Sequence, residues 1–281
     1  MKLLVLLVVL GLRRLEVNWP SWLAGGGQME RIQQRISSVL ADSTPDLLGW
    51  LARVALPSLL LAVLMLLLQG WLWGAVGWLV GAVVLLMLLG PESEFRHLDD
   101  IIVRGRMSDP DTLGQLAKEH FGAQGNPRDS GYFADLMSRI LHRDSGHLFA
   151  TVFFLMTLGY WAAFFYLANR WLAGRPEIAG HRAALTVDAA MLWLPTRLLI
   201  LVLALAGDFR RVMDAVNGRM LQLEENRQVL EDAAIAALDL REEPDPSNLQ
   251  AGIDMLEGLQ SLLLRCLAMW LILAAIWAML T

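Results

Sequence analysis

Arg197 carries the most informative chemistry in this sequence, because it is the only ionisable residue in the apolar stretch Ala189–Ala206. A charge at bilayer depth costs about 2.5–3.5 kcal/mol on insertion scales, so it is retained where it faces a protein interior or a water-filled cavity. A guanidinium there offers paired N–H donors that suit a carboxylate or a phosphate. Arg197 therefore predicts an anion-binding site inside a membrane, and the alternative is a snorkelling or structurally paired arginine.

Two neighbours of Arg197 bear on this site. Pro195 lies two positions before it and removes one backbone hydrogen bond, which predicts a kink or a break in the helix. Asp188 opens the same segment, nine positions before Arg197. On an ideal helix this spacing places the two side chains on opposite faces. Both would act at one site only if the helix breaks at Pro195; otherwise each has its own partners.

A further candidate for anion binding is Arg104, in the sequence Arg104-Gly105-Arg106. It ends an expected helix that begins where the chain leaves the membrane, and paired donors there would bind an anionic head group or a phosphate. The alternative is an arginine that anchors the chain on the positively charged side of the membrane.

The other polar residues do not match a known catalytic spacing. Four of the five histidines fall within Glu92–His147, but none forms an H-x-x-x-H or H-E-x-x-H pattern. The sequence G-x-x-x-x-G-K-[ST], which cradles nucleotide phosphates, is absent. We therefore expect no metal and no cofactor.

The composition indicates that membrane helices position these residues. Apolar residues make up 56% of the chain, and charged residues 18%. From Val54 to Gly90 the only strongly polar side chain is that of Gln69. A single helix of that length would measure about 55 Å, whereas a bilayer core is about 30 Å thick, so we expect two spans and a turn. The net charge of −5 argues against nucleic acid as a partner.

We expect an all-α, polytopic membrane helix bundle that forms a single domain over residues 1–281, with membrane lipids around it. A short N-terminal apolar helix, Leu3–Leu12, is expected to be retained or re-entrant. Five spans are predicted, near residues 54–69, 72–90, 148–168, 189–206 and 262–280, with polar helical segments at 91–147 and 207–261. Lysines and arginines near the span ends place both polar segments in the cytoplasm and the C-terminus outside.

The polar segments have their own helical patterns. Glu94–Arg104 and Tyr132–Leu141 carry apolar residues at helical spacing. Gly122–Gly131 is expected to be a loop, because it is rich in glycine and contains proline and asparagine. Asp208–Leu240 predicts one longer amphipathic helix, whose acidic face would suit a protein partner.

At its best-defined motif the chain resembles a known family. Asp188, followed by Trp193-Leu194-Pro195-Thr196-Arg197-Leu198, resembles the Asp…Trp-hydrophobic-Pro-x-Arg-Leu motif of AmpE proteins. These are inner-membrane proteins tied to β-lactamase induction, and they share an ancestor with the CobD/CbiB enzymes of the cobalamin pathway. The chain departs from the AmpE pattern at Leu192, where that family carries an acid, and from the cobalamin enzymes at Ala189, where their acids are paired.

The resemblance implies a multi-pass protein of the bacterial inner membrane, with a regulatory or sensory part in the response to β-lactams. Its implied ligand is an anionic small molecule, muropeptide-like or phosphate-bearing, and the ligand-binding residues carried over are Arg197, Asp188, Arg104 and Pro195. One alternative is a CobD/CbiB-type ligase that joins a carboxylate to an amino-alcohol phosphate; the missing acid pair argues against it, and catalytic activity stays open. Another is a structural protein whose acidic segment docks a partner.

Overall fold

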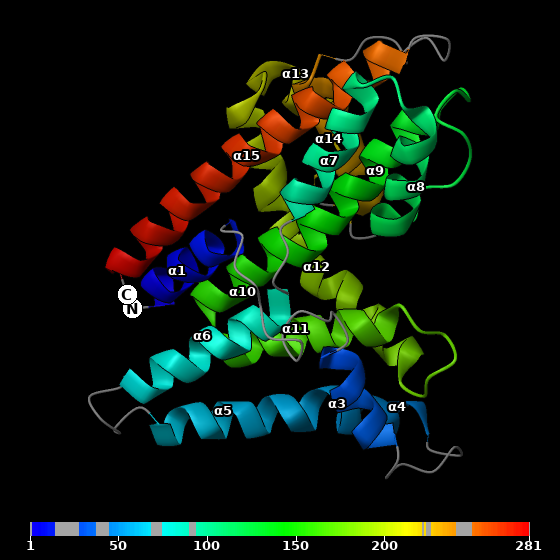
Figure 1. Ribbon diagram of the computed structural model, residues 1–281. Helices are drawn as coiled ribbons and strands as arrows, with labels where there is room; N and C mark the ends of the chain where they lie inside the picture. Colours follow the sequence, from blue (N-terminus) through cyan, green and yellow to red (C-terminus); the bar gives the residue numbers. More distant parts are fainter. Residues whose placement is uncertain are drawn as a thin grey trace. The chain divides into compact units, whose positions relative to one another are not determined.

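The structure is a computed structural model and describes residues 2–14, 28–37, 45–68, 75–89, 94–220, 222, 226–239 and 249–280 (Figure 1). These residues form helices joined by turns and loops, with no strand among them, which confirms the predicted all-α class. They belong to two compact units. The first unit comprises Met1–Glu92, Ala150–Leu192 and Ala274–Thr281, and the second Ser93–Phe149 and Trp193–Leu273.

The helices of the first unit are α1 (Lys2–Arg14), α3 (Gln28–Ser37), α4 (Asp46–Trp50), the π-helical turn η1 (Leu51–Ala55), α5 (Leu56–Leu68), α6 (Ala75–Leu89), α10 (Ala150–Thr157), α11 (Tyr160–Ala173) and the start of α12 (His181–Ala206). Those of the second unit are α7 (Glu94–Arg106), α8 (Pro110–Phe121), α9 (Tyr132–Asp144), the π-helical turn η3 (Ser145–Phe149), the rest of α12, α13 (Phe209–Ala215), α14 (Asn226–Ala237) and most of α15 (Leu249–Leu280).

Three of the described helical segments are long and apolar enough to cross a membrane. They are Asp46–Leu68, His181–Ala206 and Leu249–Leu280, and they overlap the expected spans at 54–69, 189–206 and 262–280. On α5, Leu66 and Leu67 are 65% and 73% exposed. Leucines that face outward along a whole helix suit a lipid environment better than water. These helices are consistent with a membrane protein.

The first unit begins with the short apolar helix that the sequence predicts. α1 packs against α6, and Arg13 Nη2 donates to Leu89 O at 2.9 Å near the end of α6. α6 covers most of the expected span 72–90, while the expected turn before it lies outside the described residues. The buried arginine thus ties the end of α1 to the end of the apolar helix beside it.

The segment 148–168, which the sequence predicts as one span, contains the end of one helix and the start of another. α10 ends at Thr157 and α11 begins at Tyr160. Between them Gly159 has a backbone φ of +102°, a conformation that residues with a side chain rarely adopt. The rings of Phe154 and Tyr166 lie 5.0 Å apart, although twelve residues of straight helix would separate them by about 18 Å. The two helices therefore fold back on each other, so the segment 148–168 is not the single spanning helix that the sequence predicts.

The start of α12 is fixed by a carboxylate from another helix. Asp46, at the start of α4, accepts from Gly180 N at 2.7 Å through Oδ1 and from Ala183 N at 3.0 Å through Oδ2. The first N–H groups of a helix have no acceptor within it, so this side chain satisfies two N–H groups at the start of α12. Gly49 makes the contact possible, because a Cβ atom there would lie 2.8 Å from Ala179 O.

In the second unit the predicted short helices are present. α7 and α9 cover the two amphipathic segments, and the expected loop Gly122–Gly131 joins α8 to α9. The predicted apolar face of α9 is buried and comprises Tyr132, Phe133, Leu136, Met137, Ile140 and Leu141. Helical periodicity in these short polar segments thus predicts both the helix and the face it buries.

The expected long helix Asp208–Leu240 is interrupted. α13 ends at Ala215 and α14 begins at Asn226, and between them Gly218 adopts φ +77° in a turn. The amphipathic pattern on either side is present, but the chain leaves the helix in the middle. The prediction of one continuous helix is therefore wrong, and the interruption exposes backbone carbonyl groups that a continuous helix would have bonded internally.

Candidate anion-binding site

Arg197 is buried on a helix that continues through Pro195. α12 runs unbroken from His181 to Ala206 with the proline inside it, so the break that the sequence allowed is absent. Pro195 itself is buried. Thr196 and Arg197 are each 5% exposed. The prediction that this arginine faces a protein interior is confirmed.

Two donors of the Arg197 guanidinium are bound to backbone. Nε donates to Met220 O at 2.5 Å, and Nη2 donates to Gln222 O at 2.5 Å. Both carbonyl groups belong to the interruption between α13 and α14. The ring of Trp193, one turn earlier on α12, has its centroid 5.9 Å from Cζ. The arginine thus holds the interrupted segment against α12.

The third nitrogen of Arg197 has no such partner. Nη1 is buried and makes no hydrogen bond with any described residue, and no described carboxylate forms an ion pair with this guanidinium. Burying a charge without a counterion costs free energy, and the two carbonyl dipoles offset only part of that cost. Chemically, the edge formed by Nη1 and Nη2 is suited to an oxyanion, which would supply both the charge and the missing acceptor.

Asp188 has its own partners in the first unit. Its Oδ2 lies 3.7 Å from Arg170 Nη1, and the same Nη1 donates to the hydroxyl of Tyr166 at 3.4 Å. Oδ1 of Asp188 is buried without a hydrogen-bond partner among the described residues. Asp188 and Arg197 therefore engage different residues, which is the second of the two arrangements that their spacing allowed.

Arg104 and Arg106 behave differently at the end of α7. Arg104 is exposed, and its side chain has no hydrogen bond to the described residues. The pKa of Asp109 lies below its usual value mainly because of hydrogen bonds from Thr112, and the positive charge of Arg104 adds to this effect. Arg106 reaches α15: its Nη2 lies 2.5 Å from Asp254 Oδ1 and 2.8 Å from Glu257 Oε2.

Contact with Glu257, and then with Asp254, raises the pKa of Arg106. Of the two arginines in the predicted head-group site, Arg106 is therefore already paired with protein carboxylates, and Arg104 is the one available to a ligand. Gly105 between them allows the approach of α15, because a Cβ atom there would lie 2.6 Å from Ile253 Cδ1.

A polar cluster that the sequence does not reveal joins α9 to α14. Ser138 Oγ donates to Glu231 Oε1 at 2.5 Å, and His142 Nε2 lies 2.8 Å from the same oxygen. Arg227 Nε donates to it at 3.1 Å, and Arg227 Nη2 donates to Ser138 Oγ at 3.1 Å. Each helix shows an i, i+4 pair of polar residues, but only the tertiary fold shows that the pairs meet.

This cluster sets the charge state of Glu231. Burial alone would raise its pKa, but the hydrogen bonds from Ser138, His142 and Arg227 outweigh it and lower the pKa. Two other histidines, His97 and His120, stack with ring centroids 3.9 Å apart. Within the described part of the chain, no three His, Cys, Asp or Glu side chains are grouped as metal ligands.

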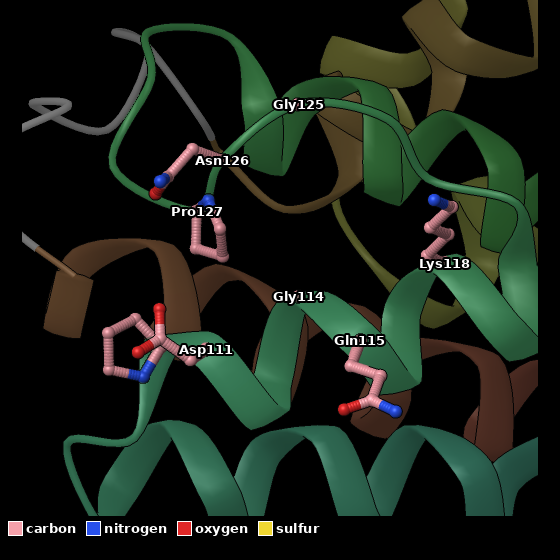
Figure 2. Close-up of a pocket in the computed structure, with 8 residues that line it drawn as sticks. Asp111, Gly114, Gln115, Lys118, Gly125, Asn126 and Pro127 are labelled. Carbon is pink, nitrogen blue, oxygen red and sulfur yellow. The ribbon is translucent and has the colours of Figure 1, made fainter.

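An open groove of about 380 Å³ lies between α8 and the loop Gly122–Gly131 (Figure 2). Its lining residues are Pro110, Asp111, Gly114, Gln115, Lys118, Gly125, Asn126 and Pro127. The sequence predicts the loop but gives no sign that the loop and the helix enclose a hollow.

Comparison with protein-family models, with curated proteins and with solved structures gives no match for this chain. The family resemblance therefore depends on the sequence motif from Asp188 to Leu198 alone.

Proposed function

We propose that this chain is a regulatory membrane protein of the AmpE type, located in a bacterial inner membrane, that binds an anionic group at Arg197. The observation that carries the proposal is the unpartnered Nη1 of Arg197, a residue that is only 5% exposed. The motif residues from Trp193 to Leu198 support the family assignment. A part in β-lactamase induction, with a muropeptide-like or phosphate-bearing signal, follows from that resemblance.

The free edge of Arg197 defines the ligand chemistry. A guanidinium carries its N–H donors in a rigid, planar fork. The edge formed by Nε and Nη2 is occupied by the carbonyls of Met220 and Gln222. The adjoining edge leaves one hydrogen of Nη1 and one of Nη2, which suit two oxygens of a carboxylate or a phosphate in parallel.

The same contacts give a physical basis for sensing. Arg197 holds the interrupted segment between α13 and α14 through two backbone carbonyls. An anion bound to this guanidinium alters its hold on that segment. Binding on α12 is thereby transmitted to α13 and α14, whose exposed charged residues are the surface offered to a protein partner. A ligand that binds without changing those contacts would carry no signal.

The proposal is tested with Arg197→Leu and Arg197→Lys in cells that carry inducible β-lactamase. Leucine removes the charge, and lysine keeps it but lacks the planar fork. We expect induction to be lost with leucine and to fall by about tenfold or more with lysine, because a charge-assisted hydrogen bond contributes about 1.5–3 kcal/mol. Membrane abundance and thermal stability are measured beside β-lactamase output.

Arg265 provides the matched control. It also lies on an apolar helix and donates to a backbone carbonyl, that of Ala206, at 2.8 Å, but it is exposed. Arg265→Leu should leave induction unchanged. Full induction in Arg197→Leu at normal abundance would remove Arg197 from the site. Magnesium- and ATP-dependent amide formation by the purified chain, abolished by Asp188→Asn, would instead favour the ligase alternative.

A further inference from the structure

Arg197 is not the only residue of its helix turn with a buried donor that lacks an acceptor. The indole nitrogen of Trp193 is buried as well, and it makes no hydrogen bond with any described residue. A buried N–H group without an acceptor costs free energy, and native proteins contain few of them. Two such donors, Trp193 Nε1 and Arg197 Nη1, therefore point to an acceptor that the described residues do not supply.

The helix brings these two donors to one place. Trp193 and Arg197 are four positions apart on α12, so they lie on the same face, one turn apart. Side chains on a helix lean toward its N-terminus, which carries Arg197 back over the turn of Trp193. Arg197 Cζ lies 5.9 Å from the centroid of the indole ring. Two hydrogen bonds of about 2.9 Å to neighbouring oxygens of one anion bridge donors up to about 8 Å apart, so one oxyanion can accept from both residues.

The two side chains offer donors only. The indole has a single N–H and no acceptor, and the guanidinium has five N–H groups and no acceptor. Arg197 uses Nε and one hydrogen of Nη2 on the carbonyls of Met220 and Gln222. The edge between Nη1 and Nη2 keeps two N–H groups, and Trp193 Nε1 adds a third. Two adjacent oxygens that carry no proton satisfy all three, as in a carboxylate or a phosphodiester.

The charge of the site is that of one guanidinium. No described carboxylate forms an ion pair with Arg197, and α12 is apolar enough to cross a membrane. A singly charged anion leaves the pair neutral. A doubly charged anion leaves one negative charge unpaired in apolar surroundings, which costs free energy. The site therefore distinguishes anions by charge as well as by the number of free oxygens.

The segment that Arg197 holds belongs to the surface. Gln222 is exposed and Met220 is half-buried, and Asn217 and Gly218 in the same interruption are exposed. Movement of this turn breaks no helix, since α13 ends at Ala215 and α14 begins at Asn226. It thus provides a route by which a small anion reaches the guanidinium.

We propose that Trp193 and Arg197 together form an oxyanion site that selects a singly charged carboxylate or phosphodiester over a doubly charged phosphate. The indole N–H is the third donor to the anion, and the single guanidinium sets its charge. This inference rests on the proposed function, because it names the class of anion that Arg197 binds there.

The experiment uses the full chain in detergent and three small anions as probes. Dimethyl phosphate and acetate carry one charge, whereas methyl phosphate carries close to two at pH 8, because its second pKa is about 6. The rise in melting temperature is followed with increasing anion at constant ionic strength. We expect dimethyl phosphate and acetate to bind, and methyl phosphate to bind about tenfold more weakly or worse, since its second charge stays unpaired.

Two variants assign the donors. Trp193→Phe keeps an aromatic ring but removes the N–H, and it should weaken dimethyl phosphate by about tenfold, the loss expected for one hydrogen bond to a charged group. Arg197→Leu should abolish binding. Trp270→Phe is the matched control, because Trp270 is also buried in the second unit and packs edge-on against Phe149. It should leave binding unchanged. The rise caused by the anion decides, so lost packing is not mistaken for lost binding.

The outcomes separate this inference from the proposed function. Binding that is lost in Arg197→Leu but unchanged in Trp193→Phe overturns the role of Trp193 and leaves the proposed function intact. Methyl phosphate that binds as tightly as dimethyl phosphate at pH 8 overturns the selection by charge. Absence of binding by dimethyl phosphate and acetate, or binding that persists in Arg197→Leu, overturns the whole inference. The proposed function is then decided separately, by β-lactamase induction in Arg197→Leu.

Discussion

Glu231 is the acceptor on which three side chains of two helices converge, and this makes it sensitive to pH. A carboxyl group whose pKa is lower in the folded state binds its proton more readily in the unfolded state. Its contribution to stability is present above the unfolded pKa, 4.5 for this residue type. The contribution is lost as the pH falls through the folded pKa, when the carboxylate is protonated.

We predict that Glu231→Gln lowers the free energy of unfolding by about 1–3 kcal/mol at pH 7, because the donors of Ser138 and His142 lose a charged acceptor. The difference from the unmodified chain should shrink below pH 4.5 and vanish once Glu231 is protonated. Thermal unfolding in detergent between about pH 3 and pH 8 spans this change. Glu119→Gln is the control, because it removes a carboxylate of the same unit that makes no hydrogen bond with the described residues. A constant deficit in Glu231→Gln at all pH values would contradict the explanation.

Arg197 shows what a sequence reveals about a single residue. Its burial follows from the sequence, since a lone charge in an apolar stretch has to face protein or water. Its partners do not follow, because they are backbone carbonyls at Met220 and Gln222. Every residue carries such a carbonyl group, so no residue type marks them. Sequence therefore predicts which side chain needs a partner better than it predicts which groups become that partner.

At the scale of elements, the predictions succeed where one segment determines its own structure. The buried face of α9 follows from periodicity within the helix itself. The interruptions at Gly159 and Gly218 are missed, because a single glycine is tolerated inside a helix at a cost of about 1 kcal/mol. Contacts such as that between Phe154 and Tyr166, which come from the folded unit, decide whether the helix continues.

Glycine at position 49 tests such a contact between elements. Replacing glycine by alanine inside a helix ordinarily stabilises it by about 0.5–1 kcal/mol. At Gly49 the new Cβ would lie 2.8 Å from Ala179 O, a backbone atom next to the start of α12. We predict that Gly49→Ala lowers the melting temperature, because α4 must move away and Asp46 loses its bonds to Gly180 and Ala183.

Gly11 is the matched control, because it also lies in a helix but a Cβ atom there would meet no described atom of another element within 4 Å. Gly11→Ala should raise the melting temperature or leave it unchanged. The contrast between the two variants in one thermal-unfolding experiment isolates the tertiary contact from helix propensity. An equal response at both positions would mean that the approach of Gly49 to Ala179 does not hold α4 and the start of α12 together.

At the scale of the whole molecule, the second unit links two polar segments that are distant in sequence. Arg106 of α7 pairs with Asp254 and Glu257 of α15, and His142 of α9 lies 2.8 Å from Glu231 of α14. Side chains in contact share one side of a membrane. The described parts of the polar segments 91–147 and 207–261 are therefore expected on the same side, as the distribution of lysine and arginine also predicts.

This gives a topology that reporter fusions can test. Fusions after Asp144 and after Glu231 should report the same compartment, the cytoplasm. A fusion after Thr281 should report the opposite side, because α15 is long and apolar enough to cross the membrane once. The chain between the two polar segments, α10 to α12, must then cross an even number of times or not at all. Opposite signals from the fusions at Asp144 and Glu231 would be incompatible with the contact between His142 and Glu231, and would require the second unit to be assembled differently.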